Sequence, residues 1–518
     1  MKGVDTLIEL IKLIVRKIYF GVLLLTSVGC SIFTKRIVES DQDQANKYAS
    51  LINKQDLFLD LNVLASDSLE GRETATKGQK KAAEYIKNHF IKNNIKSAFD
   101  TSYYQQYEVN VTDFTNVSLS INGEPLELIE DFYVFGNPQK TNYKNTKVTF
   151  VGYGIENSKV NYYENRDVEG NVVLIKDGVP ELANPYLYSS SDANWRNKVK
   201  SAAENGAIAA IFMLKDFDDK NQRIKEHILN PRMKMHNSIQ VKKSEIPVFF
   251  ISEKVYQQMT TQKPYTFKDK KRSNEIFKVD TKVSFHTDVN NIVKAENVLG
   301  YIPGKNNEEV LVISAHYDHI GFDRGEICNG ADDDGSGTAA LLSISKAFQK
   351  AFNDGIQPER SVLFLSVSGE EKGLFGSKYY TDNPVFDLNK TVANLNIDMV
   401  GRRDTIQEDD NYIYLIGSDK ISKDLHQINE QVNKKHIGFK LDYTYNDEKD
   451  PNMFYYRSDH YNFAKNNIPV IFYFGGLHED YHKPSDEIDK INFSKLEKVS
   501  QYVFLTAWEL ANRKTSLK

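Results

Sequence analysis

Histidine, aspartate and glutamate side chains follow short apolar runs in the second half of the sequence. His316 and Asp318 come after the run 310–314, Glu370 and Glu371 after 362–367, Asp398 after 392–397, and His482 after 470–474. Imidazoles and carboxylates gathered at one place would repel one another or stay unsatisfied without a cation, and this mixture of ligands suits zinc. The pattern therefore predicts a metal site.

The elements that would position these residues alternate between strands and helices. Strand-like runs cover 298–302, 310–314, 362–367, 392–397, 412–416 and 470–474, and amphipathic helical segments cover 338–352, 373–380 and 421–434. This alternation predicts an α/β fold, a three-layer sandwich with a mostly parallel central sheet. In such sheets the functional site lies at the carboxyl ends of the strands, where four of the motifs fall.

A fifth cluster, Gly-Ala-Asp-Asp-Asp-Gly-Ser-Gly at 330–337, precedes the helix expected from 338. Each motif alone has a structural explanation. The three aspartates suit a helix N-terminus, a His-x-Asp pair suits a simple hydrogen bond, and a Glu-Glu pair suits a solvated helix end. Because all five fall in register with the α/β pattern, we favour a single functional site.

The same motifs resemble peptidase family M28, the co-catalytic zinc aminopeptidases and their relatives. The resemblance is carried by His-Tyr-Asp at 316–318, the cluster 330–337, Gly-Glu-Glu-Lys-Gly at 369–373, Asn-Ile-Asp at 396–398 and Tyr-His-Lys-Pro at 481–484. It extends to Leu-Glu-Gly-Arg-Glu-Thr at 69–74, which is similar to the opening segment of the family. Residues 140–264 resemble a protease-associated (PA) domain, a smaller β-rich α/β insert.

The resemblance implies two zinc ions per chain. It assigns Asp333 as the carboxylate shared by both ions, because two close cations need a common anion to offset their repulsion. His316 and Asp398 would complete one site, and Glu371 and His482 the other. The remaining assignments are Glu370 as general base, Asp318 as the acid that orients a ligand imidazole, Tyr481 as an oxyanion donor and Arg457 as a substrate contact. His319, His460 and His478 receive no role.

The activity implied is that of an aminopeptidase, which hydrolyses N-terminal residues from peptides. Three alternatives stay open: a carboxypeptidase or dipeptidase of the same family, a glutaminyl cyclase, which has this fold and typically one zinc, and a receptor-like binding protein. The complete set of five ligands favours hydrolysis with two metals. Peptides are the expected partners. The 66 basic and 71 acidic residues are interspersed, so the sequence lacks the basic block typical of nucleic-acid binding.

The N-terminus predicts export. Lys12, Arg16 and Lys17 precede the apolar run 18–28, which is shorter than the about 20 residues that span a bilayer. Val-Gly-Cys at 28–30 resembles a lipoprotein processing site, so we expect a signal peptide at 1–30 and a lipid on Cys30; a signal-anchor is the alternative. The mature protein would then be a cell-envelope lipoprotein or a secreted protein.

The length of 518 residues calls for more than one domain. We expect a tether at 31–45, a first part of the peptidase domain at 46–139, the insert at 140–264 and the catalytic part at 265–518. Cys328 would be the only cysteine left after processing, and we expect it to be a buried small side chain.

Overall fold

The computed structural model describes residues 44–99, 101–136, 138–180, 186–214, 217, 224–225, 228–236, 246–259, 279–515 and 517. The expected signal peptide, Cys30 and nearly all of the expected tether lie outside the described residues. Within the described part of the chain, no helix combines the length and apolarity needed to cross a membrane. The chain divides into two compact units, with boundaries between Tyr107 and Glu108 and between Lys294 and Ala295.

The first unit is built on a central sheet with the strand order β19-β18-β20-β17-β13-β16-β12, followed by β2. Pairing is parallel from β16 through β13 and β17 to β20, and antiparallel on either side of this group. The strands are β2 (Tyr104–Thr112), β12 (Asn290–Ile302), β13 (Asn306–His316), β16 (Arg360–Val367), β17 (Thr391–Asp398), β18 (Tyr412–Ile416), β19 (Lys440–Asp442) and β20 (Val470–Phe474). The predicted mostly parallel sheet is confirmed.

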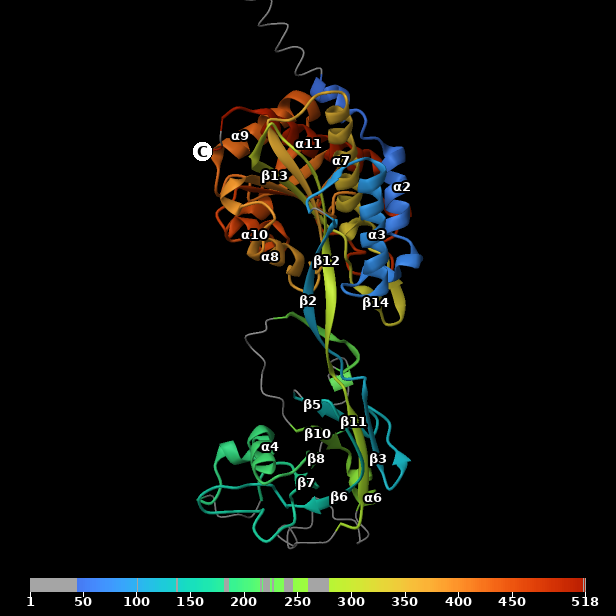
Figure 1. The fold of residues 1–518 in the computed structure, drawn as a ribbon, viewed down its shortest axis with the longest axis vertical. Helices are drawn as coiled ribbons and strands as arrows, with labels where there is room; N and C mark the ends of the chain where they lie inside the picture. The colour runs from blue at the N-terminus through green and yellow to red at the C-terminus, as the bar shows by residue number, and fades with distance from the viewer. Residues whose placement is uncertain are drawn as a thin grey trace, which may run out of the picture. The chain divides into compact units, whose positions relative to one another are not determined.

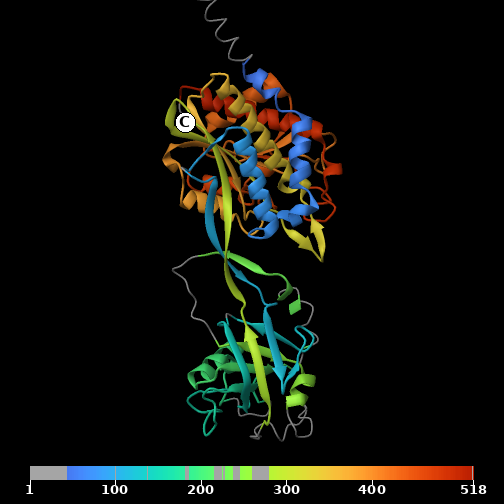
Figure 2. The ribbon, with the colours of Figure 1, turned by 45° about the vertical axis from the view of Figure 1, so that its right-hand side comes forward.

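Helices cover both faces of this sheet (Figures 1 and 2). On one face α7 and α11 contact the strands, and α2 packs against both helices; on the other, α10 contacts β17 and β20, and α8 packs on α10. The helices are α2 (Lys54–Leu64), α3 (Lys77–Lys92), α7 (Gly337–Asn353), α8 (Phe375–Asp382), α9 (Lys423–Val432), α10 (His460–Ala464) and α11 (Phe493–Asn512). This arrangement is the three-layer sandwich predicted from the sequence.

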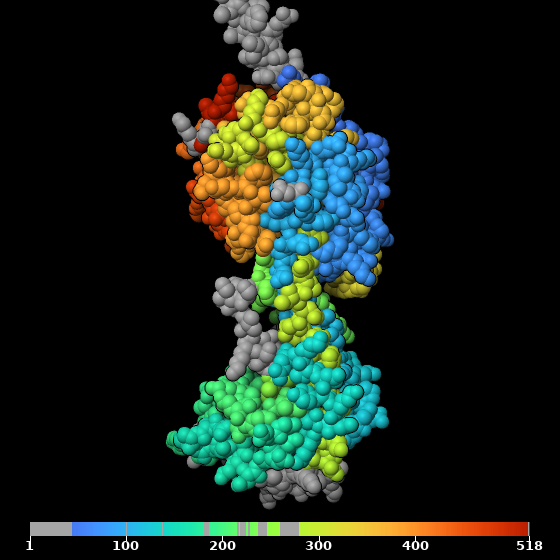
Figure 3. Space-filling model, viewed as in Figure 1, coloured from blue at the N-terminus to red at the C-terminus, as the bar shows by residue number. Residues whose placement is uncertain are grey.

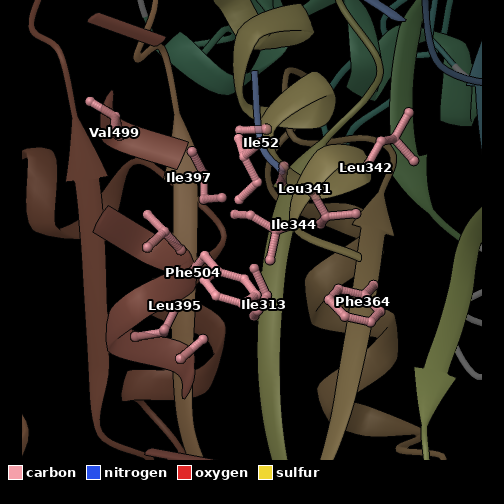
Figure 4. Packing of buried hydrophobic residues seen from close by; sticks show 14 of the residues in the cluster. Ile52, Ile313, Leu341, Leu342, Ile344, Phe364, Leu395, Ile397, Val499 and Phe504 are labelled. Atoms are coloured by element: carbon pink, nitrogen blue, oxygen red, sulfur yellow. The ribbon is translucent and has the colours of Figure 1, made fainter. Parts of the chain in front are cut away.

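The core between α7, α11 and the sheet is apolar and closely packed. Ile313, Phe364 and Leu395 project from three neighbouring strands toward Leu341 of α7 and Phe504 of α11 (Figure 4). The alternate residues of β13 and β16 lie in a second cluster on the opposite face. Burial on both faces explains why these strands read as continuous apolar runs in the sequence.

The N-terminal segment belongs to the same unit as the C-terminal half. Helix α2 contacts α7 and α11, although more than two hundred residues separate these helices in the sequence. In the space-filling view, N-terminal residues lie beside residues of the C-terminal half on the face of the first unit that is shown (Figure 3). A short turn, η1 (Asp67–Arg72), connects α2 to α3 and delivers Arg72 to the interior, where it is 0% exposed.

The second unit, Glu108–Lys294, has its own sheet with the strand order β4-β3-β11-β6-β7-β8-β10-β5. Its elements are β3 (Val117–Ile121), β4 (Glu124–Pro125), β5 (Phe132–Phe135), β6 (Thr141–Phe150), β7 (Val172–Lys176), α4 (Trp195–Glu204), β8 (Ala209–Met213), β9 (Arg232–Met235), β10 (Val248–Ile251), α6 (Glu253–Met259) and β11 (Lys282–Thr287). The insert expected at 140–264 lies inside this unit. The unit is wider because β3, β4, β5 and β11, outside that range, pair into the same sheet.

Candidate metal centre

The carboxyl ends of two adjacent parallel strands bring the first predicted pair together. His316 is the last residue of β13, and Asp398 is the last residue of β17. His316 Nε2 lies 3.5 Å from Asp398 Oδ1, and both residues are buried. On its far side Asp398 accepts a hydrogen bond of 2.6 Å from Ser458. The pair is therefore fixed by the sheet and by one hydroxyl group.

Asp333 lies between this pair and a second one. Its Oδ1 is 3.4 Å from His316 Nε2, and its Oδ2 is 3.1 Å from His482 Nε2. His482 Nε2 is also 3.1 Å from Glu371 Oε2. The two oxygens of one carboxylate thus face two separate histidine–carboxylate pairs. All five residues for which metal ligation is predicted meet in one cluster.

The carboxylate of Asp334, the last of the three consecutive aspartates, accepts hydrogen bonds from the backbone of surrounding segments. Asp334 Oδ1 accepts hydrogen bonds from the backbone of Gly337 (2.9 Å) and Met399 (3.1 Å), and Oδ2 accepts one from the backbone of His316 (3.2 Å). By distance alone Asp334 groups with His316 and Asp398 as a candidate metal ligand. Because backbone donors already occupy both of its oxygens, we assign it to the support of the loop, and the middle carboxylate faces the cluster.

The donor set fits a cation. Asp333 Oδ2, Glu371 Oε1 and His482 Nε2 are buried atoms without a hydrogen-bond partner in the described part of the chain. Buried polar atoms in this state cost about 1–3 kcal/mol each. Carboxylate oxygens and imidazole nitrogens are zinc ligands, so zinc ions at this place would satisfy them. One ion would be held by His316, Asp398 and Asp333, the other by Asp333, Glu371 and His482.

The adjacent residues Glu370 and Glu371 have opposite electrostatic surroundings. Burial opposes ionisation of Glu371, but its contacts with His319 and His482 outweigh burial and lower its pKa to about 2. Burial raises the pKa of Glu370 well above its usual value, and the charges of Glu371 and Asp398 add to this effect. Glu370 lines the same pocket as His316 and Asp398. Of the two, Glu371 is therefore suited to hold a cation and Glu370 to bind and release a proton.

The carboxylate of Asp318 supports the loops around the site. Asp318 Oδ2 accepts a hydrogen bond of 2.6 Å from Thr74, and Oδ1 accepts one of 3.3 Å from the backbone of Glu370. The nearest acceptor to His316 Nδ1 is the main-chain carbonyl of Asp318 at 3.1 Å, whereas the carboxylate is 3.8 Å away. The orienting contact expected from this side chain is thus made by its backbone.

Tyr481 and Arg457 lie together beside the cluster. The Tyr481 ring stacks on His482 with centroids 3.8 Å apart, and Arg457 Nη2 donates to the Tyr481 hydroxyl at 3.4 Å. Burial raises the pKa of Tyr481, so the phenol keeps its proton and can donate a hydrogen bond. Both residues line the same pocket as Glu370.

This pocket opens onto the residues His316, Asp333 and Asp398 of the cluster. Its remaining wall is mainly apolar and comes from β20 and the neighbouring loops: Met399, Phe454, Phe472, Phe474 and Leu477. A wall of this kind suits the side chain of an apolar residue, while the charged groups lie at one end.

The loop that carries His482 is anchored at two points. The carboxylate of Asp486 accepts hydrogen bonds from the backbone of Asp332 and Asp333 at 3.1–3.2 Å, which ties this loop to the aspartate loop. Asp480 pairs with Arg402 at 2.9 Å and Lys490 at 2.7 Å. His482 has a φ of 56°, a left-handed conformation that these anchors maintain.

Sequence reasoning missed three residues at this site. Arg72 donates hydrogen bonds to four backbone carbonyls, Ser458 contacts Asp398, and His319, which received no role, lies 2.9 Å from Glu371. Arg72 lies in the segment 69–74 and Ser458 follows Arg457, but no spacing rule indicates their contacts. His319 had one usable signal, its place three residues after His316 on the same strand end.

Comparisons with known proteins are consistent with these observations. The family described as Peptidase family M28 matches residues 297–507, and the PA domain matches 142–259. The chain is 25% identical over 342 residues to Aminopeptidase YwaD of Bacillus subtilis (strain 168), covering 64% of this chain and 63% of that protein. It is 28% identical over 235 residues to Leupeptin-inactivating enzyme 1 of Streptomyces exfoliatus, covering 41% and 48%.

These alignments span less than two thirds of the length of either curated relative. Among solved structures, an aminopeptidase from Aneurinibacillus sp. strain AM-1 is similar with a TM-score of 0.48 and 20% identity, covering 92% of this chain and 97% of that one.

Proposed function

We propose, from the match of residues 297–507 to peptidase family M28 and of residues 142–259 to a PA domain, that the chain is a zinc-dependent aminopeptidase acting on peptides. The observation that carries the proposal is the position of Asp333, whose two oxygens face His316 at 3.4 Å and His482 at 3.1 Å. A carboxylate shared in this way suits a pair of cations. The relatives named as aminopeptidases support the choice of reaction.

When bound, two zinc ions would supply Lewis-acid chemistry, polarising the scissile carbonyl and acidifying a water molecule. Glu370 would take the proton of that water and deliver a proton to the leaving amine. Burial raises its pKa above that of an ordinary carboxylate, which favours a group that takes up a proton and then releases it. Tyr481 would donate a hydrogen bond to the developing oxyanion, and the neighbouring guanidinium of Arg457 would keep the phenol in place.

The apolar pocket supports a preference for substrates with an apolar N-terminal side chain. Its wall residues Phe472 and Phe474 come from β20, the strand next to β17, which ends in Asp398. A side chain seated there would place the adjacent carbonyl beside the charged end of the pocket. An acidic or basic side chain would lose solvation against this wall.

The test is a panel of peptides with free and blocked N-termini, assayed with and without a chelator, together with metal content per chain. We expect cleavage only of free N-termini, its loss with the chelator and two zinc ions per chain. Equal cleavage of blocked peptides would contradict the aminopeptidase assignment. A single zinc with cyclisation of N-terminal glutamine would favour the cyclase alternative.

We also propose that the protein is exported and lipid-anchored through Cys30. The support is the basic stretch Lys12 to Lys17, the apolar run 18–28 and the Val-Gly-Cys sequence. Metabolic labelling with a radioactive fatty acid should mark the wild-type protein, whereas a Cys30→Ser variant should stay unlabelled. Cys328→Ser is the matched control, since that thiol is buried in the folded protein. Equal labelling of the Cys30 and Cys328 variants would contradict the anchor.

A further inference from the structure

His319 is a buried histidine that the proposed mechanism does not use. It lies three residues beyond the end of β13, and its backbone N–H donates to the carbonyl of Arg72 at 3.3 Å. The side chain is 0% exposed. Gly330, with a φ of 56°, makes room for it, because a Cβ at this glycine would lie 2.5 Å from the imidazole ring. The fold thus places this imidazole against the aspartate loop.

The imidazole is directed at the Glu371 half of the cluster. His319 Nδ1 is 2.9 Å from Glu371 Oε1 and 3.8 Å from Asp333 Oδ2. Despite this short distance, neither Nδ1 nor Oε1 has a hydrogen-bond partner in the described residues, since their directions do not meet the geometry of a hydrogen bond. Two buried polar atoms in contact without a hydrogen bond are costly unless a third group satisfies both.

His482 also has a buried ring nitrogen that lies close to carboxylate oxygens without a hydrogen bond. Its Nε2 lies 3.1 Å from both Asp333 Oδ2 and Glu371 Oε2, and it too lacks a hydrogen-bond partner among the described residues. Two imidazole nitrogens, of His319 and His482, therefore lie close to two carboxylates, those of Glu371 and Asp333. A cation is the group that accepts lone pairs from all of them at once.

The other side of Asp333 has a smaller set of metal-binding groups. There His316 faces Asp333 Oδ1 and also Asp398 Oδ1. The nearby carboxylate of Asp334 is occupied by backbone N–H groups. The described residues thus offer three ligands on this side and four on the side of His482. Three protein ligands leave a coordination position for water or substrate, whereas four are typical of a closed zinc site.

We propose that His319 is a fourth protein ligand of the zinc ion held by Asp333, Glu371 and His482. The two ions are then unequal: the ion on the His482 side binds more tightly, and the ion on the His316 side keeps the open position. This inference rests on the proposed two-zinc function and adds a ligand to it.

The first test needs no variant. X-ray absorption at the zinc edge of the wild-type protein loaded with two zinc ions counts the imidazoles around the metal. We expect three imidazoles shared by two ions. Two imidazoles shared by two ions would overturn the role of His319 and leave the proposed function intact. A wild-type protein that binds no zinc would overturn the proposed function itself.

The second test measures zinc affinity by competition with a chromophoric chelator. A His319→Ala variant should lose affinity for one ion only, by more than the about 10–100-fold typical of residues that act behind a ligand. His426→Ala is the matched control, because this histidine of α9 contacts Ser418 at 3.0 Å and belongs to neither candidate metal group. A smaller loss, or an equal loss for both ions, would overturn direct ligation.

Discussion

Ser458 donates a hydrogen bond of 2.6 Å to Asp398 Oδ2, which leaves Asp398 Oδ1 facing His316 Nε2 at 3.5 Å. Ser458 is itself held by Asn396, whose amide donates to the serine oxygen at 2.9 Å. The hydroxyl therefore fixes which oxygen of Asp398 points toward the metal site. Contacts of this kind orient ligand carboxylates and add to metal affinity.

A Ser458→Ala variant should weaken binding of one zinc ion by about 10–100-fold, because a freed carboxylate can rotate away from His316. Chelator competition measures this loss, and the affinity for the second ion should stay unchanged. Ser500→Ala is the control: this buried serine of α11 bonds only to the carbonyl of Leu496 among the described residues. If both variants bind zinc alike, Ser458 does not orient Asp398.

Arg72 links three segments that meet behind the site. Its guanidinium donates hydrogen bonds to the carbonyls of Leu64 in α2, Tyr317 after β13, and Asn329 and Gly330 before the aspartate loop. A lysine cannot reproduce this planar set of donors. An Arg72→Lys variant should therefore lose about 2–4 kcal/mol in the free energy of unfolding, because buried carbonyls lose their partners, and it should also bind zinc more weakly.

The control for this change is Arg360→Lys. Arg360 is also buried and donates to the carbonyls of Leu510, Arg513 and Thr515, but at the other end of the unit. We expect a similar loss of stability with normal zinc affinity. Denaturant unfolding followed by the fluorescence of Trp508, after replacing Trp195 by Phe, reports on the first unit alone, because the chain has two tryptophans, one in each unit. Equal zinc affinity in both variants would contradict the supporting role of Arg72.

Glu370 and Glu371 are adjacent and should give opposite results when changed to glutamine. Glu370→Gln removes the group that moves protons, so we expect kcat to fall by about 10²–10⁴-fold with both zinc ions retained. Glu371→Gln removes a predicted ligand, so we expect loss of zinc before any loss of fold. Metal analysis and peptide hydrolysis on the same samples separate the two effects. Activity that survives in the Glu370 variant would show that another group is the base.

Leu477 is the most accessible apolar residue of the pocket wall, being half-buried in the loop after β20. A Leu477→Ala variant should lower kcat/KM for N-terminal leucine by about 10-fold, because a few methylene contacts in an apolar pocket contribute about 1–3 kcal/mol. N-terminal alanine should be affected less, since it does not reach the wall. Leu59→Ala, on the exposed side of α2, is the control. An equal loss for both substrates would place the pocket elsewhere.

The sequence predicted the parts of this protein that depend on local patterns. The strands around His316 and Asp398 read as apolar runs because both faces of the sheet are covered, and the ligand motifs follow directly from the strand ends. Spacing could not separate Glu370 from Glu371, because adjacent residues share the same strand end. Their difference lies in the contacts of His319 and His482 with Glu371, which come from other loops.

Other features depend on contacts between distant segments. The role of Arg72 requires that α2, the end of β13 and the aspartate loop meet, and no local pattern encodes this. The limits of the second unit depend on pairing of β11 with β3 and β6, and the paired residues are up to 170 positions apart in sequence (Thr287 and Val117). Such long-range pairings are visible only in the folded chain.

Lys198 gives the second unit a pH dependence that can be measured. This lysine of α4 is 2% exposed, and its ammonium group donates a hydrogen bond of 3.1 Å to the carbonyl of Lys176 and another to the carbonyl of Gly178. Burial lowers its pKa from 10.5 to about 8, an effect that Asp177 only partly offsets. Below pH 8 the lysine is charged in both the folded and the unfolded state, so the folded state bears the full cost of burying the charge.

Between pH 8 and about 10.5 the folded state releases this proton while the unfolded state keeps it, so stability rises with pH in this window. The gain should reach at most about 3 kcal/mol. Unfolding of the second unit can be followed by the fluorescence of Trp195 in a Trp508→Phe background. Lys198→Met should remove the gain in stability across the window of ~pH 8–10.5. Lys200→Met, an exposed position of the same helix, should keep it. A pH profile that is the same in both variants would show that Lys198 is not the group that titrates.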